Sequence, residues 1–179
     1  TDSGRGWKLI GTTGKTSYVD KKLLPAFGYG YRVRAVCQTG AVLRSGAYSK
    51  RVNVLTRPAV PGNRSIKAIT RAGKKTKAEF TCKASARASG YEICQYNQRT
   101  KQYQPSYRIQ GTKVYIYRKA DKRYQKIGKV RKSGGKITGT LTKINLKQYK
   151  KQYFKVRAYV DKSGYSRQYS KFSGRIILK

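Results

Sequence analysis

The stretch YRVRAV at residues 31–36 recurs as FKVRAY at residues 154–159. Each copy alternates apolar with basic side chains, and a period of two is typical of a β-strand with one buried and one wet face. We therefore expect the apolar residues to face a core and the basic residues to face water. The basic residues are Arg32 and Arg34 in the first copy and Lys155 and Arg157 in the second.

Two further pairs of segments extend this repeat in both directions. WKLIG (7–11) is similar to YQKIG (124–128), and GAYSKRVNVL (46–55) is similar to RQYSKFSGRIIL (167–178). The three matches keep the same order along the chain, which indicates a structural unit that is present twice. The first copy is expected to lack the front half of the unit.

Other segments also have strand character. KAEFTC (77–82), YEICQY (91–96) and KVYIYRK (113–119) alternate in the same way, and turns rich in glycine, serine, asparagine and lysine separate them. Short strands with frequent turns favour an all-β fold. The architecture that we expect is an antiparallel β-sandwich.

Proline and glycine mark a boundary between the two copies. The segment RPAVPGN (57–63) contains two prolines and a glycine, which predicts a short and fairly stiff linker. The expected modules are then 1–56 and 64–179. The second module carries an insertion near 97–111.

The charge balance favours anionic partners. The 179 residues include 43 Lys and Arg, 6 Asp and Glu and no His, so the formal net charge is +37. The absence of His excludes a Ser/His/Asp triad and a His general base. The six acidic residues are scattered along the chain and are more simply interpreted as salt-bridge partners than as a catalytic pair. We therefore expect no enzymatic activity and no cofactor.

The cysteines do not form a recognisable motif. Cys37, Cys82 and Cys94 contain no C-x-x-C spacing, which argues against a zinc ribbon or a redox motif. Cys37 and Cys82 each come two positions after a residue that we expect to face the core. We therefore expect both to be small buried thiols. A bridge between Cys82 and Cys94 is the alternative, and the exposure of Cys94 stays open.

The chain has features of an excerpt from a longer polypeptide. It contains no methionine and begins at Thr1 without a signal sequence. No apolar run approaches the roughly 20 residues that a membrane-spanning helix needs. We therefore expect no membrane span.

The segment GTTGKTS (11–17) has the ending of a phosphate-binding loop, but the motif is incomplete. The pattern G-x-x-x-x-G-K-[ST] requires glycine five residues before Gly14, where the chain has Leu9. A phosphate loop also needs a helix after it, and the following residues alternate like a strand. We interpret the segment as a turn between strands.

The segment LLPAFGYGYRVRA (23–35) matches the pattern L-x-P-x-x-x-Y-x-Y-x-V-x-A. It resembles the fibronectin type III module, in the lysine- and tyrosine-rich variety of bacterial secreted and cell-surface proteins. The best match covers residues 7–56. The resemblance implies strand C′ at WKLIGTT, E at TSYVDKKL, F at YGYRVRAV and G at YSKRVNVLT. It also implies that Tyr29 is the tyrosine-corner residue, whose hydroxyl bonds to nearby backbone.

The second copy departs from that pattern in three places. Gln152 stands at the corner position, and Cys82 stands where the family has a core tryptophan in strand B. Strand C is either GYEICQY (90–96) or KVYIYRK (113–119). The resemblance nevertheless implies tandem immunoglobulin-like β-sandwich modules, of which the first is truncated.

The resemblance implies a non-catalytic spacer and adhesion module of a bacterial secreted or cell-wall-associated protein, located outside the cell. Its partners would be neighbouring domains and an anionic wall polymer or glycan, with nonspecific binding of nucleic acid at low salt. A nucleic-acid-binding protein is the alternative function. If KVYIYRK is strand C, its two tyrosines share a sheet face with the basic residues of FKVRAY. The candidate polyanion-contacting residues are Arg32, Arg34, Tyr115, Tyr117, Lys155 and Arg157. The competing interpretation is that lysine and tyrosine simply cover a solvated face.

Overall fold

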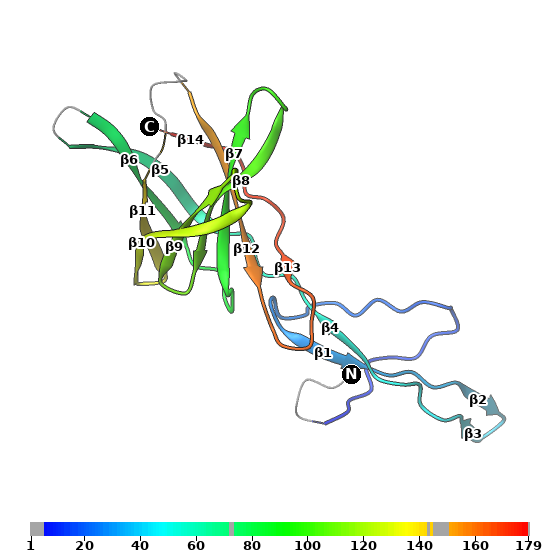
Figure 1. Cartoon of the computed structure of the whole chain (residues 1–179). Coiled ribbons are helices and arrows are strands. Elements are labelled where there is room, and N and C mark those ends of the chain that lie inside the picture. Colours follow the sequence, from blue (N-terminus) through cyan, green and yellow to red (C-terminus); the bar gives the residue numbers. More distant parts are fainter. Residues whose placement is uncertain (1–5, 72–73, 143, 145–150, 179) are drawn as a thin grey trace.

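The computed structural model describes residues 6–71, 74–142, 144 and 151–178, and every regular element in this part is a β-strand (Figure 1). All strand pairs are antiparallel, which confirms the all-β prediction. The strands are β1 (Gly28–Tyr31), β2 (Val36–Thr39), β3 (Val42–Ser45), β4 (Val52–Leu55), β5 (Gly62–Arg71), β6 (Lys74–Lys83), β7 (Gly90–Asn97), β8 (Gln102–Gln110), β9 (Lys113–Arg118), β10 (Arg123–Ser133), β11 (Lys136–Thr142), β12 (Tyr153–Val160), β13 (Gln168–Tyr169) and β14 (Ile176–Ile177).

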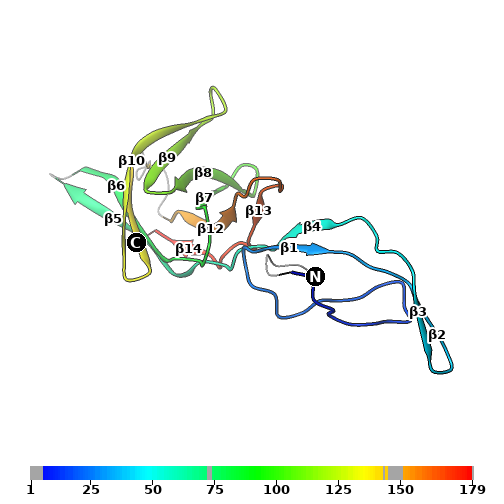
Figure 2. The ribbon, with the colours of Figure 1, turned by 90° about the horizontal axis from the view of Figure 1, so that it is seen from below.

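Strands β5 to β14 form one curled sheet in the order β13-β12-β7-β8-β9-β10-β11-β6-β5, with β14 also pairing with β12. The sheet has the shape of a half-barrel (Figures 1 and 2). Strand β10 joins its two halves, because its first part pairs with β9 and its last part, from Val130 onward, pairs with β11. A register shift between Lys126 and Gly128 lies just before this change of partner.

The concave side of the sheet holds the core. The apolar residues of FKVRAY lie here as predicted, since Phe154, Val156 and Ala158 are fully buried. They pack in one cluster with Phe80 from β6 and Ile109 from β8. The alternation in the sequence therefore identifies the buried face of β12 correctly.

The two segments proposed for strand C lie at different places in the sheet. GYEICQYN is β7 and pairs with β12, whereas KVYIYR is β9 and lies two strands farther away. Residues 97–111, where we expect an insertion, contain the last residue of β7, a turn and the whole of β8.

Residues 6–56 form a separate extended part that we call the arm (Figures 1 and 2). It contains two small ladders, β1 with β4 and β2 with β3. A small apolar cluster of Ala26, Leu55 and Val160, with Tyr165 packed against it, connects the arm to the sheet. Residues 56–61 lead from β4 into β5.

The strands expected at WKLIGTT and TSYVDKKL are not formed. Among residues 7–23 only Trp7 makes a single β-bridge, and the rest has no regular structure. The physical reason is that a strand needs partner strands, and among the described residues this segment has no strand pairing beyond the single bridge of Trp7. Within GTTGKTS, residues 14–16 form a bend, and the Tyr18 hydroxyl donates a 2.6 Å hydrogen bond to the Ile10 carbonyl across this loop.

The two copies nevertheless share a hydrogen-bond motif built on serine. The N–H of Ser49 donates to the Val33 carbonyl at 2.7 Å, and the Ser49 hydroxyl accepts from the Val33 N–H at 3.1 Å. In the second copy Ser173 makes the same two bonds with Val156, at 2.8 and 3.0 Å. Ser170, which aligns with Ser49 in the repeat, makes these two bonds with Ala158, at 2.9 and 3.0 Å, so both copies use serine in this way but in different registers.

The thiols occupy three different environments. Cys82 is buried in the core, as predicted, and Cys94 is buried on the opposite side of the sheet. The prediction of a buried Cys37 is wrong, because β2 and β3 form an isolated hairpin with no layer over either face. All three cysteines are free thiols, so the proposed Cys82–Cys94 bridge is not formed.

The structure places Tyr29 and Gln152 in different networks. Tyr29 is buried, and its hydroxyl accepts a 2.9 Å hydrogen bond from the Leu24 N–H, five residues earlier. The Gln152 side-chain carbonyl accepts a 3.0 Å bond from the side-chain amide of Gln95 on β7. The first copy thus has a hydrogen bond to a tyrosine hydroxyl at this position, and the second copy has a hydrogen bond between two side-chain amides.

Two glycines in the curled sheet provide a test of its packing. A Cβ at Gly90 would lie 2.1 Å from the Ile109 carbonyl oxygen and 2.4 Å from the Tyr159 hydroxyl, whereas a Cβ at Gly128 meets nothing within 4 Å. We expect Gly90→Ala to lower the free energy of unfolding by about 3 kcal/mol. Gly128→Ala, the matched control, should change it by less than about 0.5 kcal/mol. Denaturant unfolding measures both, and equal stability of the two variants would contradict this packing.

Candidate polyanion interface

Five side chains form a row across the convex face of the sheet. The residues directly opposite one another on β12, β7, β8, β9 and β10 are Arg157, Glu92, Arg108, Tyr115 and Lys126. Opposite residues in antiparallel strands project from the same face of a sheet. We call these five residues the outer row.

Glu92 is the centre of the outer row. Its side chain is only 3% exposed, and it accepts hydrogen bonds from Arg108 at 2.7 Å and from Arg157 at 2.8 Å. The Tyr169 hydroxyl lies 3.4 Å from the same carboxylate. One buried anion therefore holds two guanidinium groups from different strands in fixed positions.

The protonation of Glu92 follows from two opposing influences. Burial acts to raise the pKa of its carboxyl, but the hydrogen bonds and charges of Arg108 and Arg157 outweigh burial and hold that pKa below its usual value of 4.5. Glu92 is therefore ionised at neutral pH.

Aromatic rings cover both guanidinium groups. Arg108 lies 3.9 Å from the ring centroid of Tyr124, and Arg157 lies 4.0 Å from that of Tyr169. Arginine combines a planar stacking surface with a two-pronged donor, so each side chain contacts a ring and the carboxylate at once. Arg108 and Arg157 thus have a structural role on this face.

The structure brings four of the six predicted residues onto the convex face. Arg157 and Tyr115 are members of the outer row, and Tyr117 packs against Tyr124 with ring centroids 5.1 Å apart. The Lys155 ammonium lies 4.5 Å from the ring centroid of Tyr103. Tyrosines 115 and 117 share this face with β12 even though two strands, β7 and β8, lie between.

The other two predicted residues, Arg32 and Arg34, lie in the arm. Arg32 is between Trp7 and Tyr48, 4.0 and 3.8 Å from their ring centroids, and Arg34 is 4.7 Å from that of Tyr48. The six residues therefore do not form one site. They form an aromatic and basic group on the sheet and a second one on the arm.

Sequence reasoning missed several members of the convex face. Tyr96, Tyr103 and Tyr153 form a ring cluster at one end, with centroids 5.2 and 6.4 Å apart, and the Arg175 guanidinium lies 4.9 Å from the Tyr153 centroid. The alternation along β8 could not predict that Tyr103 lies on this face, because the register of β8 with β7 shifts between Ile93 and Cys94. The signal available was the density of tyrosine in residues 96–124.

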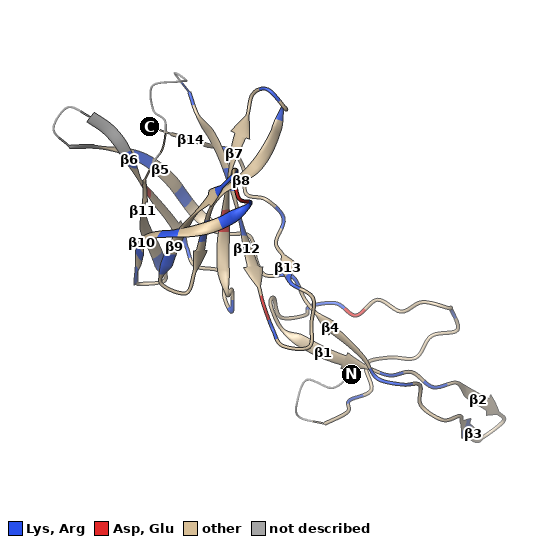
Figure 3. Cartoon of the chain, viewed as in Figure 1, with Lys and Arg blue, Asp and Glu red and all other residues tan. Residues whose placement is uncertain are grey.

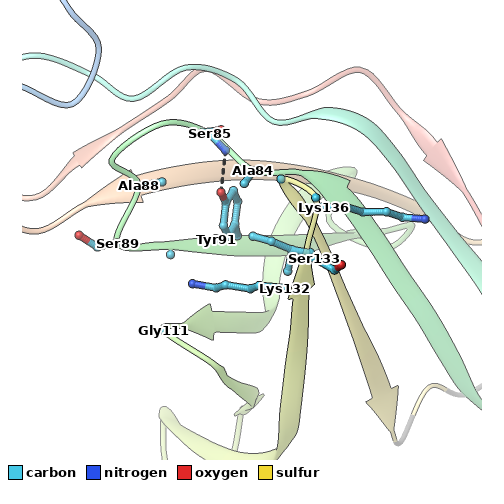
Figure 4. A pocket seen from close by; sticks show the side chains of 13 residues that line it. Ala84, Ser85, Ala88, Ser89, Tyr91, Gly111, Lys132, Ser133 and Lys136 are labelled. Atoms are coloured by element: carbon cyan, nitrogen blue, oxygen red, sulfur yellow. Dashed lines mark hydrogen bonds between the residues drawn. The ribbon is translucent and has the colours of Figure 1, made fainter.

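A cavity of about 320 Å³ lies at one end of the sheet, between the loops that precede β7 and join β10 to β11 (Figure 4). The Tyr91 hydroxyl accepts a 2.8 Å hydrogen bond from the Ser85 N–H at its wall. The hydroxyl of Ser85 itself is buried without a hydrogen-bond partner. Lys132 and Lys136 line the rim, but both side chains are exposed.

Among the described residues there is no group of three or more His, Cys, Asp or Glu arranged to hold a metal ion. The same part of the chain contains no helix long and apolar enough to cross a membrane. Comparison of the chain with family models, curated proteins and solved structures finds no match.

The buried carboxylate gives a prediction on stability. Glu92→Gln leaves Arg108 and Arg157 without their anion, and we expect the free energy of unfolding to fall by about 3 kcal/mol at pH 7. Glu79→Gln, on the exposed face of β6, is the matched control and should cost less than about 0.5 kcal/mol.

The same pair of variants has a predicted pH dependence. Because folding lowers the pKa of Glu92, its stabilisation is complete above about pH 4.5 and is lost as the pH falls through the folded-state pKa. Urea unfolding of the parent chain should show this loss, and Glu92→Gln should remove most of it. An unchanged acid profile in Glu92→Gln would contradict the assignment.

Proposed function

We propose that this chain is a non-catalytic spacer and adhesion segment of a bacterial secreted or cell-wall-associated protein, built from fibronectin type III-like modules. The strand order supports the proposal. Strands β5, β6 and β11 pair like A, B and E of such a module, and β7, β12 and β13/β14 pair like C, F and G. Strands β8 to β10 would then be an extended connection that closes one side of the sandwich.

The arm would be the C-terminal part of a second module of the same kind. The stacked pairs Arg34–Tyr48 and Arg157–Tyr169 support this equivalence, because both residues of each pair occupy aligned positions of the repeat. Residues 57–63 would serve as the linker between the modules. Two stiff units in series would hold a neighbouring domain at a distance from its attachment point.

The observation that carries the binding proposal is the convex face of the sheet, where exposed lysines stand among tyrosine rings. Lys126 is exposed and Lys155 is partly exposed, and neither forms an ion pair with a described carboxylate. Lysine and arginine also occur along both the arm and the sheet (Figure 3). With a net charge of +37, the chain should attract anionic wall polymer or glycan over a large area.

Nucleic-acid binding is the second candidate, and one observation favours it. Tyr115, Tyr117 and Tyr103 are partly exposed on the same face as the lysines, and bases stack on such rings. The spread of basic residues over the whole chain, rather than along one stripe, favours wall polymer.

A salt titration tests the function. We expect the full chain to bind fluorescently labelled teichoic acid with a log K that falls by roughly 3 to 4 per decade of salt, as for about four phosphate contacts. A Lys126→Gln/Lys155→Gln double variant should bind about tenfold more weakly. Lys77→Gln/Lys83→Gln removes the same charge from exposed positions on β6 and should have a much smaller effect.

The result decides among the alternatives. Equal losses in the two double variants would contradict a site on the convex face and leave only net charge as the cause. Stronger binding of single-stranded DNA than of teichoic acid at equal salt would favour the nucleic-acid function instead.

A further inference from the structure

The arm meets the end of the sheet at two loops, residues 84–89 and 161–167 (Figure 1). Ser89 ties the two loops together, because its hydroxyl accepts a 2.9 Å hydrogen bond from the Asp161 N–H. Arg167 closes the second loop through two hydrogen bonds to the Asp161 carboxylate, 2.5 and 2.8 Å long. The surface that the sheet presents to the arm is therefore ordered by contacts of its own.

The ring of Phe27 in the arm lies close to a cation from each loop. The Arg87 guanidinium is 5.5 Å and the Lys162 ammonium 5.8 Å from its centroid. The next residue, Gly28, also approaches the second loop, since a Cβ there would lie 2.8 Å from the Lys162 Nζ and 3.0 Å from the Tyr165 hydroxyl. Aromatic contacts therefore join the arm to both loops.

Main-chain hydrogen bonds hold the connection between the arm and the sheet. The Thr56 N–H donates to the Phe27 carbonyl at 3.0 Å, and the Ala26 N–H donates to the Arg57 carbonyl at 3.2 Å. These bonds continue the ladder of β1 with β4 into the linker. Residues 58–61 are then the only ones left before β5, and two of the four are prolines, whose φ is fixed.

We propose that these contacts form a rigid joint, which fixes the direction of the arm relative to the sheet. The joint consists of the small apolar cluster and of the phenylalanine ring with its two cations, namely Ala26, Phe27, Leu55, Arg87, Val160, Lys162 and Tyr165. Units in series usually move relative to one another unless their interface holds them. The inference goes beyond the proposed function, because it holds whether or not the chain binds a polyanion.

The charge of the chain gives the joint a measurable consequence. Lysine and arginine occur along both the arm and the sheet, so the two repel each other (Figure 3). Salt screens this repulsion over about 10 Å at 0.1 M, but it does not weaken apolar contacts. A rigid joint keeps the distance between arm and sheet independent of salt, whereas a flexible hinge lets that distance shrink as the salt concentration rises.

Two spin labels measure this distance in the full chain. They are attached at Asn53→Cys in β4 and at Thr140→Cys in β11, and exposed Cys37 is replaced by serine. Cys82 and Cys94 are buried and should take up no label. Pulsed electron resonance should give one narrow distance distribution, with a mean that differs by no more than about 2 Å between roughly 0.05 and 0.5 M salt.

Variants on each side of the joint test its parts. Phe27→Ala changes the arm and Tyr165→Ala changes only the sheet, and each should broaden the distribution about twofold and make its mean fall with salt. Phe172→Ala removes a 39% exposed ring outside the joint and should change neither the width nor the salt response. A broad or salt-dependent distribution in the parent chain would overturn the proposal. So would distributions that are equal in the parent chain and in both joint variants.

Discussion

An alternating strand is stable only when other strands pair with its edges and a second layer covers its apolar face, and this constraint separates the two halves of the chain. β12 satisfies it, with β7 on one edge, β13 and β14 on the other, and a full core beneath. The related residues 32–35 lie outside every described strand, and Val33 among them is exposed. Thirteen of the fifteen exposed large hydrophobic residues described accordingly lie before β5.

The curl of the sheet follows from the same requirement. A flat sheet would leave one long apolar face in water. By changing partners along its length, β10 turns β5, β6 and β11 toward β7, β8 and β12, so that Phe80 and Phe154 share one core. On the convex side no described strand forms a second layer, and tyrosine rings with a buried ion-pair network cover the strands instead. Glu92, between Arg108 and Arg157, anchors that cover.

This arrangement divides the basic residues by chemical type. The arginines of the outer row bind a carboxylate and stack on rings, which is a use that fits a planar guanidinium. Lys126 of the outer row is exposed and forms no ion pair with a described carboxylate. A chain of net charge +37 thus keeps an ordered sheet face, because the buried Glu92 pairs with two of its arginines.

Local patterns in the sequence predicted β6, β7, β9 and β12 and the buried face of β12, because alternation depends only on nearest neighbours along the chain. The same reasoning failed for Cys37 and Val33, since burial depends on strands that a local pattern does not reveal. Local sequence patterns also could not predict the role of Glu92. Its contact with Arg108 depends on the register of β7 with β8, and a shift between Ile93 and Cys94 changes that register within a few residues.

Amide hydrogen exchange tests the central claim most directly, namely that two related segments differ because only one has a partner strand. The amides of Lys155 and Arg157 face β7 in the ladder, whereas Arg32 and Arg34 lie outside every described strand. We predict that the first pair exchanges at least a hundredfold more slowly than the second, which should approach the rate of an unstructured chain. Equal protection of the two pairs would contradict the account.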